Sequence, residues 1–541
     1  MIFLFLTSFL LLSCFNLHAQ PPYWQWATMA GGSAEDKSLS IATDISGSIY
    51  ITGHYFSPNI VFGTDTLSTP SSMFLAKYNA NGNPVWARSA TGNTQNYGNS
   101  VATDNAGYVY VTGYATNAPW GTTITFGPYT LNKGMYLVKY DSSGNVIWAR
   151  DAVKPGGNGL NLCADPFGNI ILSGGHNGDT LFFGNDTIVQ YICFIAKYDS
   201  SGNALWGKGV TATDGILDAD GPYLSADKYG NVYAAGGFFE PVGRVDTVLM
   251  INNGSYDAYL AKFNAAGQVQ WAHNYGSWLN SQASSVACDT AGNVYITGFF
   301  TDNSITFDTI TLTAPGSSHA FIVKFNPAGS ALWARKIMWL WGTNPIKVAV
   351  DNNNDVYLTG YFGLPGSPGF LFTPTDSLTN PGLFLAKYDS NGNFKWARDA
   401  INWCRSTDVA VGPDGTPYIT GYFSNPSLIF DSNVLLHSPS NNSFDIYIAA
   451  MGSFTGMEET DGNSPFAFSV FPNPNSGQFY VVSNVHELTS VAISDMMGRI
   501  VLNQTVKAGL HFMDLTMQPK GIYIVTLRTA KSSSAKKVVL Y

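Results

Sequence analysis

Asp44-Ile45-Ser46-Gly47-Ser48-Ile49-Tyr50-Ile51-Thr52-Gly53 is the first of seven similar ten-residue copies in this chain. The closing glycines of successive copies lie 60, 61, 62, 62, 62 and 61 residues apart. A nearly fixed period of this length indicates stacked units, each of which buries its apolar face against its neighbours. The other copies lie at 104–113, 165–174, 227–236, 289–298, 351–360 and, in degraded form, 412–421.

A second marker occurs once per period: an apolar run ending in Lys-Tyr or Lys-Phe, a turn containing Gly, and then Trp-Ala, as at Lys77 and Trp86. The seventh copy has the apolar run at 447–451 but no Trp-Ala after it. That motif stands at the other end of the chain, as Trp24-Gln25-Trp26-Ala27. We therefore expect a ring in which the N-terminal strand completes the last unit, because closure leaves no open strand edge.

Each period contains four short alternating apolar runs separated by turn residues, which predicts four antiparallel strands. In the second period these strands are predicted at 100–103, 108–112, 135–140 and 146–150. Asp and Gly in the connecting turns supply side-chain acceptors and positive φ angles. The predicted fold is therefore all-β: a seven-bladed β-propeller closed by its N-terminal strand.

The composition fits a chain of many strands and turns. The protein has 541 residues, of which 55 are Gly and 12% are charged, and a mean hydropathy of +0.02. These values disfavour a disordered chain and a membrane protein with many spans. A net charge of −9 without a basic cluster argues against nucleic acid as a partner. We predict no transmembrane segment and a monomer.

The N-terminus has the pattern of a secretion signal, with an apolar stretch at 1–12 that is too short to span a bilayer. Leu17-His18-Ala19 resembles a signal peptidase site, so residues 1–19 are predicted to be removed. The alternative is that the residues before Cys14 form a lipobox and Cys14 is lipidated.

The remaining cysteines are scattered, without Cys-x-x-Cys spacing, so we predict free thiols, no metal site and no cofactor. Two acidic groups have the oxygen-rich look of a calcium site, but we favour solvated turns for both, because neither matches the twelve-residue loop with its terminal Glu. The cysteines are Cys163, Cys193, Cys288 and Cys404; the acidic groups are Asp214 with Asp218 and Asp220, and the run from Asp351 to Asp355.

The periodicity ends after Met451, which divides the chain into a propeller at 20–455, a polar linker at 456–465 and a C-terminal module at 466–541. Alternating runs in the module predict a small Ig-like β-sandwich. Its motifs are Phe471, Pro472, Asn473 and Pro474 with Gly477, then Asp495 with Gly498 and Arg499, then Gly521 and Tyr523, and a Lys-Val end.

In these motifs and their order the module resembles the C-terminal type A sorting domain of the type IX secretion system of Bacteroidetes-like bacteria. The resemblance implies the secretion translocon as a partner, transit through the periplasm, removal of the domain, and release or attachment at the outer cell surface. The repeats resemble bacterial β-propeller repeats of the SBBP type, which implies a fold more than an activity.

We expect ligands on the face that carries the long, variable connections, because binding residues concentrate on loops over a rigid scaffold. Four tryptophans stand at similar offsets in three successive connections of this face and suggest a stacking surface for a glycan or a partner protein. The alternative is that they fill gaps between blades. The four are Trp278, Trp339, Trp341 and Trp403.

Catalytic motifs are absent from the sequence: no Gly-x-Ser-x-Gly, His-Glu-x-x-His or phosphate loop occurs. We therefore predict a secreted or surface-attached binding and adhesion module and no enzyme. The alternative is a propeller-type polysaccharide hydrolase or lyase, in which two Asp carboxylates meet across the central channel.

Overall fold

The computed structural model describes residues 22–69, 71–92, 95–116, 123–151, 157–175, 180–189, 193–210, 222–314, 318–339, 346–363, 370–371, 377–437, 443–452, 468–471, 477–483, 489–495, 498–507, 509–529 and 533–540. Every helix or strand in these residues is a β-strand, which confirms the all-β prediction. In the same ranges no helix is long and apolar enough to cross a membrane. The predicted signal peptide and linker lie outside the described residues.

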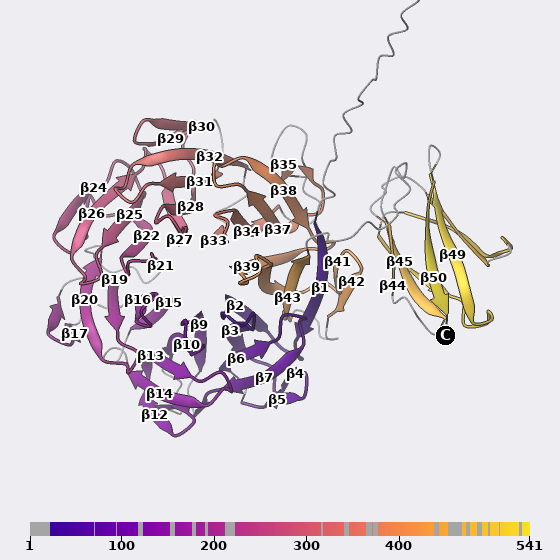
Figure 1. Cartoon of the computed structure of the whole chain (residues 1–541), viewed down its shortest axis with the longest axis horizontal. Helices are drawn as coiled ribbons and strands as arrows, with labels where there is room; N and C mark the ends of the chain where they lie inside the picture. Colours follow the sequence, from indigo (N-terminus) through magenta and orange to yellow (C-terminus); the bar gives the residue numbers. More distant parts are fainter. Residues whose placement is uncertain are drawn as a thin grey trace, which may run out of the picture.

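Seven antiparallel sheets, six of four strands and one of six strands, are arranged as a ring in the described part of the chain (Figure 1). We call each sheet a blade and number the blades 1 to 7 in chain order. Six blades are built from consecutive strands, and their first strand lies nearest the centre of the ring. A ring of radial four-stranded sheets is the architecture of a β-propeller.

The strands of blades 1 to 6 are given from the innermost outward. Blade 1 has β2 (Asp36–Thr43), β3 (Ile49–Tyr55), β6 (Ser72–Tyr78) and β7 (Pro84–Ser89); blade 2 has β9 (Asn96–Thr103), β10 (Val109–Ala115), β13 (Gly134–Tyr140) and β14 (Val146–Asp151); blade 3 has β15 (Asn158–Ala164), β16 (Ile170–Gly175), β19 (Cys193–Tyr198) and β20 (Ala204–Val210). Blade 4 has β21 (Tyr223–Ala226), β22 (Val232–Phe238), β25 (Asp257–Phe263) and β26 (Val269–Tyr275); blade 5 has β27 (Ser281–Cys288), β28 (Val294–Phe300), β31 (His319–Phe325) and β32 (Ala331–Trp339); blade 6 has β33 (Lys347–Val350), β34 (Val356–Phe362), β37 (Gly382–Tyr388) and β38 (Phe394–Asp399).

Blade 7 combines the two ends of the ring, as the missing Trp-Ala motif predicts. It has β39 (Cys404–Val411), β40 (Pro417–Phe423) and β43 (Asp445–Gly452), and its outer strand is β1 (Tyr23–Ala30). The two terminal strands pair antiparallel, from Tyr23 opposite Gly452 to Ala30 opposite Ile446. The predicted pairing of the N-terminal strand with the seventh copy is thus confirmed.

The predicted strands of the second period match blade 2, except that β9 starts four residues before its predicted start and β10 ends three residues after its predicted end. The sequence Asn96-Tyr97-Gly98-Asn99 has no apolar alternation, so periodicity does not reveal it. These residues still pair with β10, after a register shift between Thr112 and Gly113. The inner strand therefore extends farther toward the long-loop face than the sequence suggests.

The second marker motif joins each of blades 1 to 5 to the blade that follows it. The Trp86 indole and the Lys77 ammonium both donate to the carbonyl oxygen of Ser142, at 3.1 and 3.0 Å, in the outer turn of blade 2. Trp148 and Lys139 hold the carbonyl of Ser200 in blade 3 in the same way. Three further blades repeat this pair of bonds, with Trp206, Trp271 and Trp333 as the indole donors.

A short hairpin follows the second strand of every repeat. The hairpins are β4 (Ile60–Phe62) with β5 (Asp65–Leu67), β11 (Thr123–Phe126) with β12 (Tyr129–Asn132), β17 (Leu181–Phe183) with β18 (Asp186–Ile188), β23 (Val242–Val245) with β24 (Val248–Ile251), β29 (Ser304–Phe307) with β30 (Ile310–Thr313), β35 (Phe370–Leu371) with β36 (Ser377–Leu378), and β41 (Ser427–Phe430) with β42 (Asn433–Leu436). A two-residue strand, β8 (Thr91–Gly92), pairs with β11, and β23 extends the sheet of blade 3.

The C-terminal module has two sheets and its own core. One sheet consists of β44 (Phe468–Phe471), β45 (Gln478–Ser483) and β48 (Gly509–Asp514); the other consists of β47 (Ile500–Val506), β46 (Thr489–Asp495), β49 (Gly521–Arg528) and β50 (Ser533–Leu540). Its buried cluster, which includes Phe479, Ile493 and Val525, is made only of residues 468–540. The module therefore has the apolar core of an independent domain.

Candidate ligand-binding site

The two faces of the ring differ in their connections. The turns between the first and second strands and between the third and fourth strands lie on one face, which we call the short-turn face. The opposite face carries the hairpins and the connections between blades, and we call it the long-loop face. The ring begins at Tyr23 and ends at Gly452, which pair with each other on the short-turn side. The C-terminal module is therefore connected through the short-turn face.

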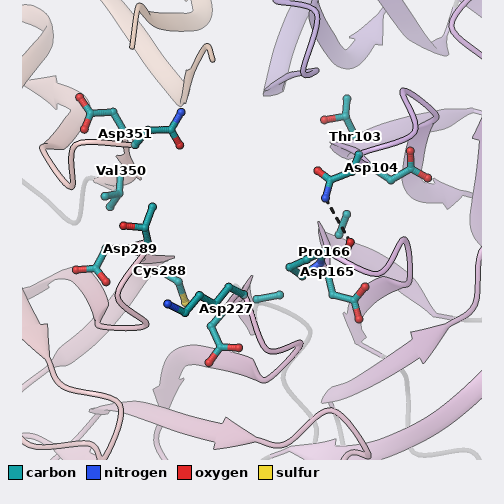
Figure 2. Close-up of a pocket in the computed structure, with 15 residues that line it drawn as sticks. Thr103, Asp104, Asp165, Pro166, Asp227, Cys288, Asp289, Val350 and Asp351 are labelled. Atoms are coloured by element: carbon teal, nitrogen blue, oxygen red, sulfur yellow. Dashed lines mark hydrogen bonds between the residues drawn. The ribbon is translucent and has the colours of Figure 1, made fainter. Parts of the chain in front are cut away.

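A cavity of about 280 Å³ opens at the centre of the short-turn face (Figure 2). Five successive inner turns line the cavity. They begin at Asp104, Asp165, Asp227, Asp289 and Asp351. In Figure 2 the carboxylates of these five residues point away from the cavity. They are therefore not placed as an acid and nucleophile pair across this mouth of the channel, which was the geometry that the hydrolase alternative required.

The turn aspartates have a structural task instead. One oxygen of Asp104 accepts the backbone N–H groups of Ala106 and Tyr108, both at 2.9 Å. Its other oxygen accepts the Tyr110 hydroxyl. Gly107 follows with φ near 81°, a left-handed conformation that glycine adopts without strain. Such carboxylates fix the turn and explain why nearly every repeat has Asp there.

The run from Asp351 to Asp355 is a turn of the same kind. Asp351 accepts the backbone N–H groups of Asn353 and Asp355, and Lys387 lies 2.8 Å from the Asp355 carboxylate. A lysine thus occupies the position that a cation would take. Among the described residues no group of three or more His, Cys, Asp or Glu is arranged to hold a metal ion. Asp214, Asp218 and Asp220 lie outside the described residues.

All four described cysteines are free thiols, as predicted. Cys193 and Cys404 are buried, whereas Cys163 and Cys288 are half-buried in inner strands. Burial raises the pKa of the Cys288 thiol to about 12 and that of Cys404 to about 12. The thiolate form that reacts or binds metal is therefore suppressed in both.

Of the four predicted tryptophans, Trp278 is the most clearly suited to binding. Its side chain is 85% exposed, in the connection from blade 4 to blade 5 on the long-loop face. Its backbone is nevertheless fixed, because its N–H donates to the Asp302 carboxylate at 2.8 Å. Hydrogen bonds from Ser277, Asn303 and the backbone of this loop lower the pKa of Asp302. An exposed indole on an ordered backbone offers a large flat contact at low entropic cost.

Trp403 is placed differently, because it packs against neighbouring residues. It is half-buried, and its indole N–H donates to the carbonyl of Gly363 at 3.4 Å. The Arg405 guanidinium lies 5.4 Å from its ring centroid, and Asn425 donates to its backbone carbonyl. Trp339 is the last residue of β32, opposite His319, and Trp341 lies outside the described residues. Binding by these three residues stays a prediction.

A second group of side chains, which the sequence motifs do not predict, lies on the long-loop face at the mouth of the ring. Arg405, Lys37 and Tyr97 lie at equivalent positions of three adjacent inner strands, β39, β2 and β9. Each of these residues directly precedes the residue that pairs with the repeat glycine on the second strand of its blade. Their partners on the second strands are Tyr422, His54 and Tyr114. We call these six residues the mouth cluster.

Rings and cations of the mouth cluster contact one another across two blade boundaries, and Arg405 also contacts Tyr361 of blade 6 across a third. Arg405 lies 4.8 Å from the Tyr361 ring of blade 6, and Lys37 lies 5.0 Å from the Tyr422 ring of blade 7. Tyr97 of blade 2 meets the His54 ring of blade 1 at 4.9 Å. Cations over aromatic rings at these distances are attracted by the ring quadrupole.

One carboxylate belongs to the same region. Glu35 lies 2.9 Å from the Lys37 ammonium and 3.7 Å from His54. Burial and the nearby Lys37 charge lower the pKa of His54 to about 4, although Glu35 acts in the opposite direction. The imidazole is therefore neutral at pH 7, and its Nδ1 is buried without a hydrogen-bond partner among the described residues.

A sequence signal for this cluster exists in the position directly after each repeat glycine. Five of the seven copies carry an aromatic residue or His there, although the side chain has no role in the repeat turn. The seven residues are His54, Tyr114, Gly175, Gly237, Phe299, Tyr361 and Tyr422.

The motifs of the C-terminal module form turns that hold its two sheets. Asp495 accepts the backbone N–H of Arg499 at 2.9 Å, and its carboxylate lies 3.1 Å from the Arg499 Nε. Gly498 between them has a φ near 80°. The Tyr523 hydroxyl donates to the carbonyl of Pro519 at 2.7 Å. Phe471 ends β44, Gly477 precedes β45 and Gly521 begins β49, whereas Pro472, Asn473 and Pro474 lie outside the described residues.

Residues 469–541 match the family described as the secretion system C-terminal sorting domain. The resemblance of the module to a type IX sorting domain is thereby confirmed, and the chain is an exported protein of the cell surface or the medium. This sorting domain follows a ring with the fold of a β-propeller.

Comparison with curated proteins gives an uncharacterised WD repeat-containing protein, L264, of Acanthamoeba polyphaga mimivirus, which is 26% identical over 533 residues. The match covers 79% of this chain and 38% of that protein, so this chain spans well under half of its relative's length.

Three solved structures are similar in fold. The WD40 domain of Neurospora crassa Pan2 is 9% identical with a TM-score of 0.37 and covers 79% of this chain and 91% of its own. YCF48 bound to a D1 peptide is 11% identical with a TM-score of 0.38 and covers 81% and 98%. PorZ, a surface component of the type IX secretion system of Porphyromonas gingivalis, is 12% identical with a TM-score of 0.17 and covers 93% and 81%. Similarities at this level carry no information about ligand or activity.

Proposed function

We propose that this protein is a surface-displayed binding and adhesion module that holds a glycan, or a protein on another surface, against its long-loop face. In this proposal the ring at 20–455 is a seven-bladed β-propeller closed by its N-terminal strand. The module at 466–541 is an Ig-like β-sandwich that contacts the secretion translocon. Cleavage after Ala19 and a monomeric state belong to the same proposal.

The observation that carries the proposal is Trp278. Its exposed indole stands on a backbone anchored by Asp302, so the ring is presented without the entropic cost of ordering a loop. Stacking of a flat apolar ring suits the faces of sugars and of partner side chains. The direction of the chain supports the same face, because the sorting module leaves from the short-turn side.

A panel of immobilised glycans and surface proteins tests the proposal, with the full chain as the probe. The expected result is that at least one ligand is retained and that Trp278→Ala weakens its binding by about 1–3 kcal/mol, as for a dominant contact residue. Phe167→Ala is the matched control, because Phe167 is 68% exposed but belongs to a short-turn connection. Equal losses in both variants, or no retained ligand, would refute the proposal.

Hydrolysis or elimination remains the second candidate from sequence, and the geometry gives it less support. The five turn aspartates labelled in Figure 2 point away from the cavity and cap their own turns. Turnover assays on the retained glycans provide the measurement. Release of reducing ends or unsaturated products by the purified chain would make the protein an enzyme.

A further inference from the structure

We propose that the mouth cluster binds an acidic polysaccharide, with Lys37 and Arg405 as the groups that recognise its carboxylates. The proposal rests on the function proposed above, because it assumes that the long-loop face binds a glycan. It concerns a different place on that face from Trp278, which lies between blades 4 and 5, whereas the mouth cluster spans blades 7, 1 and 2.

The mouth cluster carries two positively charged side chains on neighbouring strands. Two cations stand at equivalent positions of neighbouring inner strands, Arg405 on β39 and Lys37 on β2. At the same register the described inner strands β15 and β27 carry the neutral residues Asn158 and Gln282. In a chain of net charge −9, the two adjacent cations are a local exception. Such a local excess favours an anionic ligand.

The carboxylates near these cations do not pair with Arg405. Glu35 pairs with Lys37, whereas Arg405 contacts a hydroxyl group and aromatic rings. Asp36 is fully buried and accepts hydrogen bonds from Ser57, and burial raises its pKa to about 6. The Arg405 guanidinium therefore has no carboxylate within ion-pair distance among the described residues, which leaves it available to an anionic ligand.

Two buried polar atoms of the mouth cluster lack a hydrogen-bond partner among the described residues. The Arg405 guanidinium donates to the Tyr422 hydroxyl through Nη1, but its Nε is buried without a partner in the described part of the chain. The Nδ1 of His54, a side chain that is 7% exposed, is in the same condition. Buried polar atoms without partners are uncommon in folded proteins and cost free energy. A ligand carboxylate that attracts the Arg405 guanidinium toward the mouth of the ring accepts a hydrogen bond from this Nε–H.

The tyrosines of this region favour a saccharide over an acidic peptide. Tyr97 and Tyr114 are half-buried and stack with 4.9 Å between centroids and 19° between planes. Tyr361 and Tyr422 stand at the other end of the cluster, beside Arg405. The half-buried Tyr97, Tyr114 and Tyr361 supply flat rings for sugar faces and hydroxyl groups that both donate and accept, as sugar hydroxyls require.

The experiment measures binding of the full chain to polygalacturonate, to the same polymer as its methyl ester, and to poly-glutamate. The ester keeps the sugar rings and removes the charge, whereas poly-glutamate keeps the charge and removes the sugars. We expect polygalacturonate to bind at least about tenfold more tightly than either control polymer, since charged hydrogen bonds are lost with the ester. Its affinity should fall as salt rises, because exposed charges are screened.

Variants connect the binding to the two cations. Lys37→Gln and Arg405→Gln should each weaken polygalacturonate binding by about tenfold. Lys228→Gln is the control, because Lys228 is an exposed cation beside the short-turn cavity, and it should change binding less than about twofold. Lys37 has 21% side-chain exposure and stands at a surface, so its variant keeps the test decisive if Arg405→Gln fails to fold.

The other outcomes separate this inference from the proposed function. Equal binding of the ester, or equal binding of poly-glutamate, overturns recognition of an acidic sugar. Retention of other glycans through Trp278 without any binding of polygalacturonate overturns the inference and leaves the proposed function standing. Failure to bind any glycan overturns both.

Discussion

The Trp26 indole donates a hydrogen bond to the carbonyl oxygen of Ala80, 3.0 Å away, and so joins the last blade to the first. Five boundaries between successive blades have an indole bond of this kind, for example from Trp86 to Ser142. The boundary that the chain ends create is therefore sealed by the same contact as the boundaries within the chain. The N-terminal strand therefore closes the ring of blades.

Closure of the propeller ring is tested by truncating a buried tryptophan side chain in the N-terminal strand. Trp24 is 1% exposed, donates to the carbonyl of Asp399 at 2.9 Å and meets the Phe430 ring edge-on. Trp24→Ala should lower the free energy of unfolding by about 3–5 kcal/mol, because a large cavity remains. Gln25→Ala, an exposed neighbour on the same strand, should change it by less than about 0.5 kcal/mol. Urea unfolding of both variants provides the comparison. Equal stability of the two variants would contradict closure of the ring by the N-terminal strand.

A pH dependence should arise at the same boundary, from Asp36 of β2. Burial, with a contribution from Asp445, raises the pKa of this carboxyl from 3.8 to about 6, although Ser57 and Phe56 donate hydrogen bonds to it. A carboxyl with a raised folded-state pKa stabilises the fold fully below its unfolded pKa, and this contribution is lost as the pH rises to about 6. The loss between pH 4 and 7 should be about 2 kcal/mol.

Asp36→Asn isolates this effect, because the amide is close in shape and stays neutral. Its free energy of unfolding should exceed that of the unaltered protein at pH 7 and match it near pH 4. Chemical unfolding at several pH values measures the difference. A constant difference across this range would show that Asp36 titrates normally.

The repeat pattern predicted most of the ring because each strand follows a local rule. Alternating apolar residues and Asp-Gly turns recur with the period, and the unpaired Trp-Ala motif predicted which strands meet. The site was harder to predict. Arg405 and Tyr361 are 44 residues apart in sequence and meet only because neighbouring blades pack together. Trp278 and Trp403 share an offset in the sequence, but only the three-dimensional contacts distinguish an exposed indole from a packed one.

A buried ion pair should contribute strongly to blade 3. Lys197 and Asp165 are 2.8 Å apart, with side chains 3% and 0% exposed. Lys197→Met should cost about 3–5 kcal/mol of stability, because it leaves Asp165 charged and buried. The exposed pair of Lys395 with Asp389 is the control, and Lys395→Met should cost less than about 1 kcal/mol. Thermal or urea unfolding that ranks the two variants equally would refute a role for burial in this difference.

Export should depend on the C-terminal module and not on the ring. The module's buried cluster contains no ring residue, so removal of residues 466–541 should leave the ring folded. We expect the truncated protein to accumulate in the periplasm, since the matched sorting domain spans 469–541. Cell fractionation and protease protection measure its location. Surface display of the truncated chain at the normal level would show that another segment directs export.

The last prediction separates binding from packing for the tryptophans of the long-loop face. Trp278 is 85% exposed, so Trp278→Ala should leave the free energy of unfolding within about 0.5 kcal/mol of the unaltered value. Trp403 is half-buried, bonds to Gly363 and lies beside Arg405, so Trp403→Ala should lose about 1–3 kcal/mol. Thermal unfolding decides this before any ligand is known. A large loss in Trp278→Ala would mean that the indole packs against the ring, and the binding assignment of Trp278 would then be wrong. A stable Trp403→Ala variant would instead return Trp403 to the candidate ligand contacts, where its effect on glycan affinity becomes the deciding measurement.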